Sequence, residues 1–264
     1  MQVITLTTDW GTSDHFAAAF KGRILSSLPS ATIIDISHSV EPFNTIKASY
    51  VLKNSYSNFP DGTIHFVGVM RYDNIRSHEP REREIKRLII RCNNHFFIGS
   101  DSGIFSLVLG EAPKEIVMLP PMDFRNEAAK YVEVIAHIAA GKPIAELGAP
   151  AESVSQSYML KPVVDNGMVR CNIIYIDSFG NAVTNLSSEQ FEEARKARKF
   201  TLWFPDNSHY LTNISSHYTD VVSGEAVALF NSAGLLEVAQ NSGNANKLMG
   251  LKLMDTVRIE FFEG

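Results

Sequence analysis

Hydrophobic positions along the first half of this chain follow strand-like and helix-like spacings in turn. Short apolar runs with the length of buried strands are separated by segments whose apolar residues recur at helical spacing. The predicted strands are Val3–Thr8, Thr32–Ile36, Thr63–Val69, Arg87–Ile90, His95–Ile98 and Glu115–Met118, and the predicted helices cover Ser13–Leu28, Lys47–Leu52 and Tyr131–Ala140. This alternation predicts βαβ units and a mostly parallel sheet, as in a Rossmann-like α/β domain over residues 1–150.

The second half of the chain changes to short strands. The predicted strands there are Cys171–Ile176, Lys199–Phe204, Glu225–Phe230, Leu235–Val238 and Thr256–Phe262. One clear helix is predicted over Glu189–Lys196, because Ser187 and Gln190 have the spacing of a capping box. This pattern predicts a small C-terminal β-barrel domain over residues 163–264, with the polar, aperiodic segment Ala151–Pro162 as the linker.

The charge of the chain narrows the choice of partners. With 264 residues and a net charge of -5, we expect a folded, soluble protein of one large or two ordinary domains and no broad nucleic-acid surface. A basic run from Arg71 to Arg91, which includes Arg87, is interleaved with glutamates. This mixture favours a solvated loop and strand edge over a nucleic-acid patch.

Cysteine usage and hydropathy indicate the compartment. Cys92 and Cys171 are the two cysteines and lack metal-ligand spacing, so we expect neither structural zinc nor a disulfide framework. No apolar run approaches the roughly 20 residues that a membrane span needs, and the chain starts directly on a predicted strand. We therefore expect a cytoplasmic protein without a metal or a membrane partner.

Two polar stretches suggest a composite ligand site. Thr7–Asp14 follows the first predicted strand and contains Asp9 and Asp14. Ligands of open α/β sheets bind at the carboxyl ends of strands, where a carboxylate can accept hydrogen bonds from ribose hydroxyls or an amino group; alternatively, these two residues cap the following helix. Asp177–Asn185 is the second stretch. Since GxGxxG, P-loop, HExxH and GxSxG motifs are absent, spacing alone predicts a ligand-binding α/β domain plus a β domain.

Seven blocks of residues, in one order along nearly the whole chain, carry a resemblance to a known family. They are Thr8–Asp14 with Lys21 and Gly22, Asp35–His38, Phe59–His65, Asp101–Gly103, Ala136–Gly141 with Leu147 and Gly148, Asp177–Asn185, and Asn231–Leu236. The set resembles the S-adenosyl-L-methionine (SAM) hydroxide adenosyltransferase family, which also includes the SAM-dependent fluorinase and chlorinase. The resemblance implies an N-terminal α/β domain, a C-terminal β-barrel, and a homotrimer that binds SAM between the N-terminal domain of one subunit and the C-terminal domain of its neighbour.

The resemblance also implies the residues that contact SAM. They are Asp9 for the ribose hydroxyls, Phe43 against the sugar, Asp14, Asp177 and Ser232 (beside Asn231) for the methionine end, Phe179 and Tyr218 on the two faces of adenine, and Asn181 with the backbone around Gln240 and Ser242 for the polar edge of adenine. Taken singly, Phe179 could be a core residue and Asn181 part of a plain hairpin turn.

The chain departs from the family where the hydrolases organise the attacking water. Their Asp and Arg lie in and after a DPGVG-type loop, and their His lies in an FHGRD-type segment. Here Met70 stands at the Asp position, Ser77 at the Arg position, and Arg125 or Asn126 at the His position. Ala233 replaces the usual Arg of an Asn-Ser-Arg-Gly block, which weakens the case for a tightly held methionine carboxylate.

The implied reaction is an in-line displacement at ribose C5′, with neutral methionine leaving. Orientation and exclusion of water can supply much of such catalysis, whereas a general base typically contributes about 10²- to 10⁴-fold. Asp73, Arg76 and Arg125 are the candidate replacements. In an enzyme that uses another nucleophile or another nucleoside ligand, Met70 would make an apolar floor. The alternative for Asp73 and the nearby His78 is a solvent-exposed hairpin tip.

Three functional hypotheses follow, with SAM as substrate or ligand and no separate cofactor. The first is a SAM hydrolase, of weakened or altered activity, that yields adenosine and L-methionine. The others are a non-catalytic SAM- or adenosine-binding protein and a nucleoside-processing enzyme that uses another nucleophile. Halogenase activity is disfavoured, because halide capture in that branch uses small hydroxyl-bearing residues and backbone amides, whereas Arg71-Tyr72-Asp73 is bulky and charged.

Overall fold

The computed structural model describes residues 1–71, 85–110, 112–165, 167–206 and 209–263. The chain divides into two units, Met1–Tyr158 and Met159–Gly264, and the boundaries expected from the sequence, residues 150 and 163, lie on either side of this division. Asp73 and Arg76, two candidate catalytic residues, lie outside the described residues.

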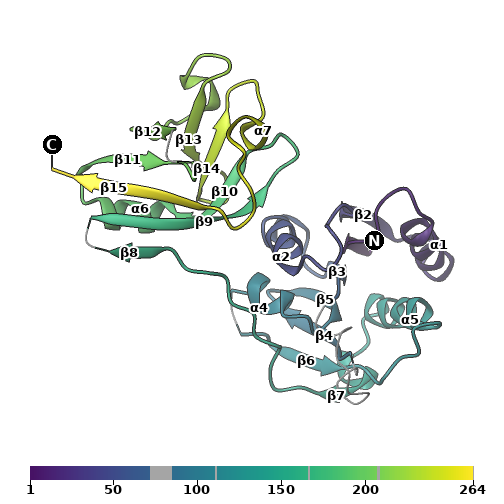
Figure 1. The fold of residues 1–264 in the computed structure, drawn as a ribbon. Helices are drawn as coiled ribbons and strands as arrows, with labels where there is room; N and C mark the ends of the chain where they lie inside the picture. The colour runs from purple at the N-terminus through teal and green to yellow at the C-terminus, as the bar shows by residue number, and fades with distance from the viewer. Residues whose placement is uncertain (72–84, 111, 166, 207–208, 264) are drawn as a thin grey trace, which may run out of the picture. The chain divides into compact units, whose positions relative to one another are not determined.

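A mixed β-sheet forms the centre of the first unit (Figure 1). Its described strands are β1 (Val3–Thr8), β2 (Thr32–Ser37), β3 (Ile64–Gly68), β4 (Arg87–Cys92), β5 (His95–Ser100), β6 (Glu115–Met118) and β7 (Ala149–Pro150). They lie in the order β2-β1-β3-β5-β4-β6-β7. The sequence predicted a mostly parallel sheet. The pairs along β2-β1-β3-β5 are parallel, whereas β4 pairs antiparallel with β5 and β6, and β7 pairs antiparallel with β6.

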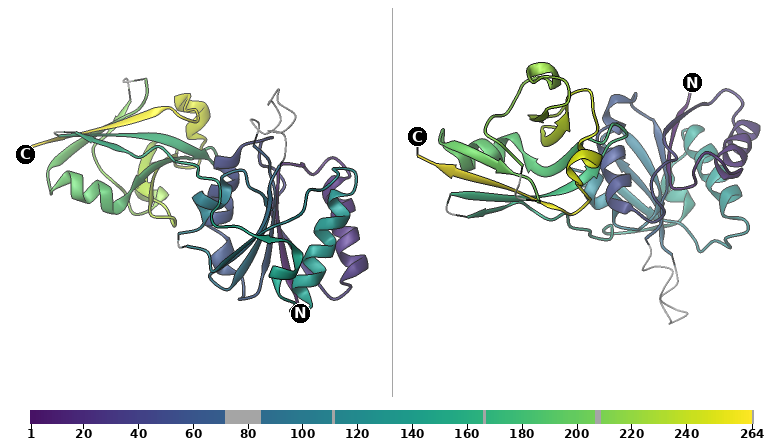
Figure 2. Two further views of the ribbon diagram at one scale, coloured as in Figure 1. Left: turned by 90° about the horizontal axis from the view of Figure 1, so that it is seen from below. Right: turned by 45° about the horizontal axis from the view of Figure 1, so that its top comes forward.

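Helices cover both faces of this sheet (Figure 2). They are α1 (Phe16–Ser27) and α5 (Glu127–Ala139) on one face, α2 (Thr45–Lys53) and α4 (Ile104–Val108) on the other, and the short 3₁₀ turns η1 (Tyr56–Asn58) and η2 (Ile144–Leu147). Side chains alternate across a strand, so Phe66 of β3 packs with α1 and α5, whereas its neighbour Val67 packs with α2 and α4. The two faces therefore form separate apolar clusters.

The second unit is a nearly closed antiparallel barrel. Its described strands are β8 (Val163–Asp165), β9 (Met168–Ile176), β10 (Ala182–Ser187), β11 (Lys199–Trp203), β12 (Tyr210–Leu211), β13 (Ala226–Phe230), β14 (Leu235–Gln240) and β15 (Thr256–Phe262). The path runs β12-β11-β15-β9-β10-β14-β13, and β8 pairs with β9 outside it. Because β12 lies close to β13, the two ends of the path approach each other. The interior is filled by large side chains such as Phe191, Phe200 and Phe204.

Helices of the second unit agree in part with the sequence. The predicted capping box opens α6 (Ser188–Arg195): the Ser187 hydroxyl accepts from Gln190 N–H at 3.2 Å, and the side-chain Oε1 of Gln190 accepts from Ser187 N–H at 3.1 Å. The prediction of one helix in this unit is incomplete, since α7 (Ala245–Met249) is also present, as is the 3₁₀ turn η3 (Tyr218–Asp220). Five residues are too few to show a helical period.

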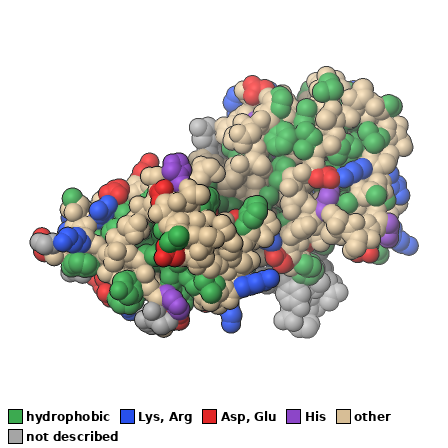
Figure 3. All heavy atoms as spheres, turned by 90° about the horizontal axis from the view of Figure 1, so that it is seen from above, with side chains coloured by type: hydrophobic (Ala, Val, Ile, Leu, Met, Phe, Trp, Pro, Cys, Tyr) green, Lys and Arg blue, Asp and Glu red, His purple; other side chains and the backbone are tan. Residues whose placement is uncertain are grey.

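Within the described part of the chain, no helix combines the length and apolarity that a membrane crossing requires. On the face drawn in Figure 3, basic and acidic side chains are interspersed with hydrophobic ones.

Candidate functional site

Strand order places a crevice at the carboxyl end of β1. The chain passes from β1 to β2 on one side and later returns to β3 on the other side, so the winding reverses at β1. Ligands of open α/β sheets bind at such switch points. Thr8 and Gly68 are paired in register at the ends of β1 and β3, so the residues that follow both strands meet at one edge of the sheet.

A cavity of about 530 Å³ lies at this edge. Its apolar wall includes Trp10, Phe20, Phe43, Phe66, Met70 and Phe124, and its polar groups include Asp9, His15, Arg23, Ser100, Glu127 and Tyr131. The Trp10 ring packs edge-on to Phe20, with 5.5 Å between ring centroids. A Cβ atom at Gly68 would lie 2.9 Å from the Trp10 ring, so a glycine is needed for this ring to lie against β3.

Asp9 lines the cavity and is held by the segment that precedes α2. Its Oδ2 accepts a hydrogen bond from Phe43 N–H at 3.0 Å, and Phe43 has a positive φ of 66°. Burial raises the pKa of Asp9 above its ordinary 3.8, and the Phe43 N–H opposes this shift only in part. A half-buried carboxylate with one fixed donor has further lone pairs for ligand hydroxyls.

The other residues predicted for this unit are placed differently. Asp14 is exposed and is not among the residues that line the cavity, whereas Met70 lines it. The Arg125 side chain is 76% exposed and pairs with Asp123 at 3.1 Å, away from the cavity lining. α1 begins after His15 without a side-chain cap, so the alternative that Asp9 and Asp14 cap this helix is wrong.

Two blocks of the sequence resemblance fix the surrounding loops. His38 Nδ1 lies 2.7 Å from the Thr8 hydroxyl, and its carbonyl accepts from Gly11 N–H at 2.8 Å, which ties the end of β2 to the loop after β1. Asp101 accepts two hydrogen bonds from Ser155, one from its backbone N–H and one from its hydroxyl, each at 2.8 Å. These hydrogen bonds hold the backbone near the sheet edge, and the residues that make them do not line the cavity.

A charged pair between the buried Arg87 and Glu127 of the cavity wall was not predicted from the sequence. Arg87, the first residue of β4, is 6% exposed, and its Nε donates to Glu127 Oε1 at 2.6 Å. The prediction that the basic run is solvated is therefore wrong for Arg87, because Glu127 at the start of α5 supplies a partner for the buried guanidinium. Burial alone would lower the pKa of Arg87, but the hydrogen bond and charge of Glu127 raise it overall. The two partners are 40 residues apart in the sequence, and a pairing at such a separation cannot be predicted from local residue spacing.

In the second unit, the predicted residues Asp177 and Asn181 close one turn. Asp177 Oδ1 accepts from the backbone N–H groups of Phe179 and Asn181 at 2.9 and 2.8 Å, and its Oδ2 accepts from the Asn181 amide at 3.0 Å. Gly180 has a φ of +88°, and a Cβ there would lie 2.3 Å from the side chain of Asn244. Phe179 at the turn tip is 74% exposed, so the alternative that it is a core residue is wrong.

The remaining predicted residues of this unit form two groups. The side-chain Oε1 of Gln240 accepts from Asn244 N–H at 2.8 Å, and Asn244 packs against Gly180 of the Asp177 turn. Ser242 follows Gln240 with a φ of 58°. Tyr218 and Asn231 instead meet at Glu237, a buried residue of β14: its carboxylate accepts from the Tyr218 hydroxyl at 2.8 Å and from the Asn231 amide at 3.0 Å. Ser232 belongs to the turn after β13. Glu237 was not predicted.

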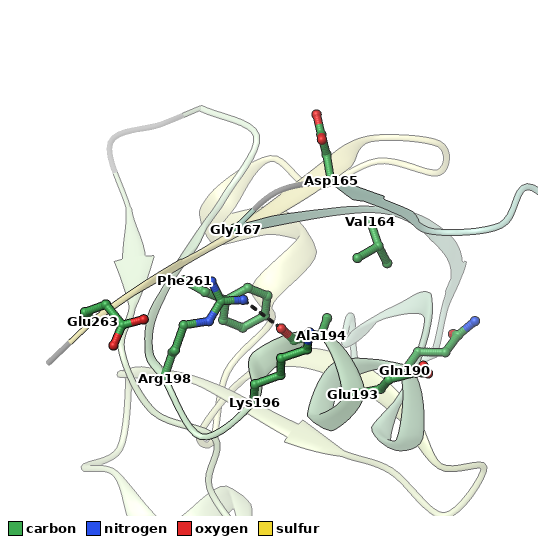
Figure 4. Close-up of a pocket in the computed structure, with 10 residues that line it drawn as sticks. All are labelled: Val164, Asp165, Gly167, Gln190, Glu193, Ala194, Lys196, Arg198, Phe261 and Glu263. Carbon is green, nitrogen blue, oxygen red and sulfur yellow. Dashed lines mark hydrogen bonds between the residues drawn. The ribbon is translucent and has the colours of Figure 1, made fainter.

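A second, larger cavity of about 1040 Å³ lies in the same unit, between β8, α6 and β15 (Figure 4). None of the predicted residues lines it. Arg198 donates to the Ala194 carbonyl at 2.9 Å and lies over the Phe261 ring. Its guanidinium therefore satisfies a carbonyl in the last turn of α6. Acidic and basic side chains are mixed around this cavity and favour no single ligand.

Metal and thiol chemistry have little support in the part of the chain that is described. Its residues include no group of three or more His, Cys, Asp and Glu placed to hold a metal ion. Cys92 and Cys171 are each buried and free, and burial raises the pKa of the Cys171 thiol to about 12.

Comparison with known proteins covers both units. The family model of the SAM hydroxide adenosyltransferase N-terminal domain matches residues 4–148, and that of the C-terminal domain matches residues 171–258. An (R)-S-adenosyl-L-methionine hydrolase from Methanocaldococcus jannaschii is 25% identical over 98% of this chain and 96% of its own. A fluorinase from Actinopolyspora mzabensis is 23% identical over 97% of this chain and 96% of its own. A crystal structure of an uncharacterized conserved protein from Thermotoga maritima has a TM-score of 0.82 and 29% identity, and covers 98% of this chain and 99% of that one.

Proposed function

Because the chain belongs to the SAM hydroxide adenosyltransferase family, with models of both family domains matching it, we propose that it binds SAM and hydrolyses it to adenosine and L-methionine. The observation that carries this proposal is the cavity at the switch point of the sheet, which the partly buried Asp9 lines. This cavity lies within the residues that match the N-terminal family model.

The proposed binding mode assigns the ribose to the first unit and the adenine to the second. Asp9 holds the ribose hydroxyls, with Phe43 against the sugar. Phe179 and Tyr218 enclose the adenine. The polar edge of the adenine faces Asn181, Gln240 and Ser242. The methionine end is held by Asp14, Asp177 and Ser232. The exposed Phe179 ring supports this mode, because its turn is fixed by three hydrogen bonds to Asp177 while the ring itself has little cover. A rigidly presented aromatic ring is suited to stacking on a base.

We propose further that the two parts of each site come from neighbouring subunits of a homotrimer. Light scattering at micromolar concentration should therefore give three times the 29.3 kDa mass of one chain. Adding adenosine should stabilise the trimer against dilution, since a ligand held by two subunits links binding to assembly. A stable monomer that binds adenosine with unchanged affinity would contradict this arrangement.

The proposed reaction is slower than in a relative that retains the family's Asp, Arg and His. This expectation is supported by Met70, which the sequence resemblance aligns with the acid and which lines the cavity, and by Arg125, which pairs with Asp123. Loss of an acid-base group typically costs about 10²-fold or more, so we expect turnover to be lower by at least that factor.

Chromatography of adenosine and methionine after incubation with each sulfonium epimer of SAM tests this function. The (R)-epimer is the expected substrate, since the relative from M. jannaschii is named an (R)-SAM hydrolase. Turnover equal to that of a relative with all three groups would overturn the expectation of a slow enzyme. Binding without any release of adenosine would instead favour a non-catalytic SAM- or adenosine-binding protein.

A further inference from the structure

Two carboxylates line the cavity among the described residues, and they are held in different ways. Asp9 accepts from the backbone of Phe43 and is the proposed ribose ligand. Glu127 lies in the wall made by the first turn of α5, with its side chain 25% exposed. No role in the proposed binding mode uses Glu127.

The Glu127 carboxylate is fixed by buried partners. Its Oε1 accepts from Arg87 Nε at 2.6 Å, and the same guanidinium donates through Nη1 to the Ile85 carbonyl at 2.9 Å, so Arg87 has little freedom to move. The start of α5 also favours a negative charge, because unpaired N–H groups point out of a helix N-terminus. Glu127 is therefore a carboxylate of defined position that still faces the cavity.

Tyr131 completes this part of the wall. It lies one helical turn after Glu127, is 6% exposed and also lines the cavity. Burial and, next, the negative charge of Glu127 raise the pKa of the Tyr131 hydroxyl, which stays protonated at neutral pH. Arg87 and Tyr131 thus surround the carboxylate with donors and leave it the proton acceptor of the group.

We propose that Glu127 is the proton acceptor for the water that attacks C5′ of SAM, and that Arg87 is its positioning residue. The inference rests on the proposed hydrolysis. As the bond between the water oxygen and C5′ forms, the bond between C5′ and sulfur breaks and its electron pair stays on sulfur, giving neutral methionine. One water proton passes to the Glu127 carboxylate and then to solvent, and the other remains as the 5′-hydroxyl of adenosine.

A carboxylate is basic enough for this step despite its contact with Arg87. The attacking water becomes strongly acidic once its oxygen bonds to carbon, so the proton is lost late and needs a well-placed acceptor more than a strong base. Placement within hydrogen-bond reach is the first requirement for a general base. The Arg87 contact and the start of α5 hold the carboxylate in one position in the cavity wall.

Glu127→Gln is the decisive variant, with Glu133→Gln as its matched control. A glutamine keeps an oxygen for Arg87 and cannot accept the proton. Glu133 lies on the same helix, with its side chain 64% exposed and paired with Lys130. We expect kcat for adenosine release to fall about 10²- to 10⁴-fold in Glu127→Gln, with KM and the calorimetric Kd for adenosine little changed. Glu133→Gln should behave as the wild type.

The outcomes separate this inference from the proposed function. If the wild type releases adenosine and Glu127→Gln does so equally fast, the inference is overturned and the proposed function stands. If KM rises while kcat is kept, Glu127 binds substrate and the inference is again overturned. If the wild type releases no adenosine, both fail. Should Glu127→Gln not fold, Glu127→Asp serves instead: it retains a carboxylate one methylene further away, and we expect a partial loss of kcat, whereas full activity would contradict the need for placement.

Discussion

Replacing Asp9 by alanine should weaken the binding of adenosine or SAM by about 1.5–3 kcal/mol, or roughly 10- to 150-fold in Kd. The variant removes the proposed acceptor for the ribose hydroxyls, and such charge-assisted hydrogen bonds are among the stronger polar contacts. It also removes the acceptor of Phe43 N–H, so the ring proposed to lie against the sugar loses its anchor. Isothermal titration calorimetry with adenosine measures the effect.

Two further variants separate charge from anchoring. Asp9→Asn keeps an oxygen for Phe43 N–H and loses the charge, so its affinity should lie between those of the wild type and Asp9→Ala. Asp61→Ala is the control, because Asp61 is an exposed residue before β3, at the opposite end of the strand from the cavity. Unchanged affinity in Asp9→Ala would remove this carboxylate from the proposed binding mode.

Local patterns predicted the elements well where one signal dominates. Val3–Thr8 was predicted as a strand and is β1 with the same bounds, since a short run of apolar and β-branched residues is typical of a buried strand. The capping box at Ser187 was likewise confirmed. The first helix was expected from Ser13 and begins at Phe16, because the polar loop after β1, with Gly11 at a φ of +70°, continues to His15.

Strand direction was harder to predict than strand position. Both β4 and β5 were predicted, yet the two strands form an antiparallel hairpin within a sheet that was expected to be mostly parallel. Asn93 and Asn94 join them, with φ values of 48° and 61°. Two-residue hairpin loops with positive φ at both positions favour asparagine and glycine. The signal was therefore present in the sequence and was outweighed by the βαβ pattern around it.

Partners far apart in sequence could not be predicted at all. Asp9 was singled out because it directly follows a strand, where position alone suggests a site. Glu127 and Arg87 are ordinary charged residues in their local context, and only the pairing of β4 beside β5 and the packing of α5 bring them together. The same holds for Glu237, which gathers Tyr218 and Asn231 from separate loops.

A buried histidine pair at the other end of the first sheet should make this unit sensitive to acid. His65 Nδ1 lies 2.7 Å from the Thr5 hydroxyl, and its Nε2 lies 3.1 Å from His95 Nδ1. The His65 ring also stacks on Phe97, with 5.0 Å between centroids. Burial and, next, the charge of His95 lower the pKa of His65 from 6.5 to about 3. In this arrangement one imidazole donates and the other accepts, and burial disfavours a positive charge on the His65 ring.

We expect protonation of His65 in the unfolded chain to lower the free energy of unfolding by about 2 kcal/mol between pH 8 and pH 5. Below pH 6.5 the unfolded chain takes up a proton at this residue, whereas the folded chain does not until the pH nears 3. The stability is therefore present above the unfolded pKa and falls as the pH drops below it. In His65→Phe, which keeps a ring against Phe97, this part of the pH dependence should disappear, although stability at pH 8 is lower because the Thr5 hydroxyl loses its partner.

Urea unfolding followed by the fluorescence of Trp10 measures this effect in the first unit alone. Trp10 and Trp203 are the two tryptophans of the chain, so a Trp203→Phe background leaves a single reporter, in the unit that contains His65. His137→Gln is the matched control, because His137 lies on α5 of the same unit with its Nε2 2.9 Å from the Pro143 carbonyl oxygen and takes no part in the buried pair. Equal slopes of stability against pH in the background protein and in His65→Phe would show that His65 accepts a proton in the folded state as readily as in the unfolded one.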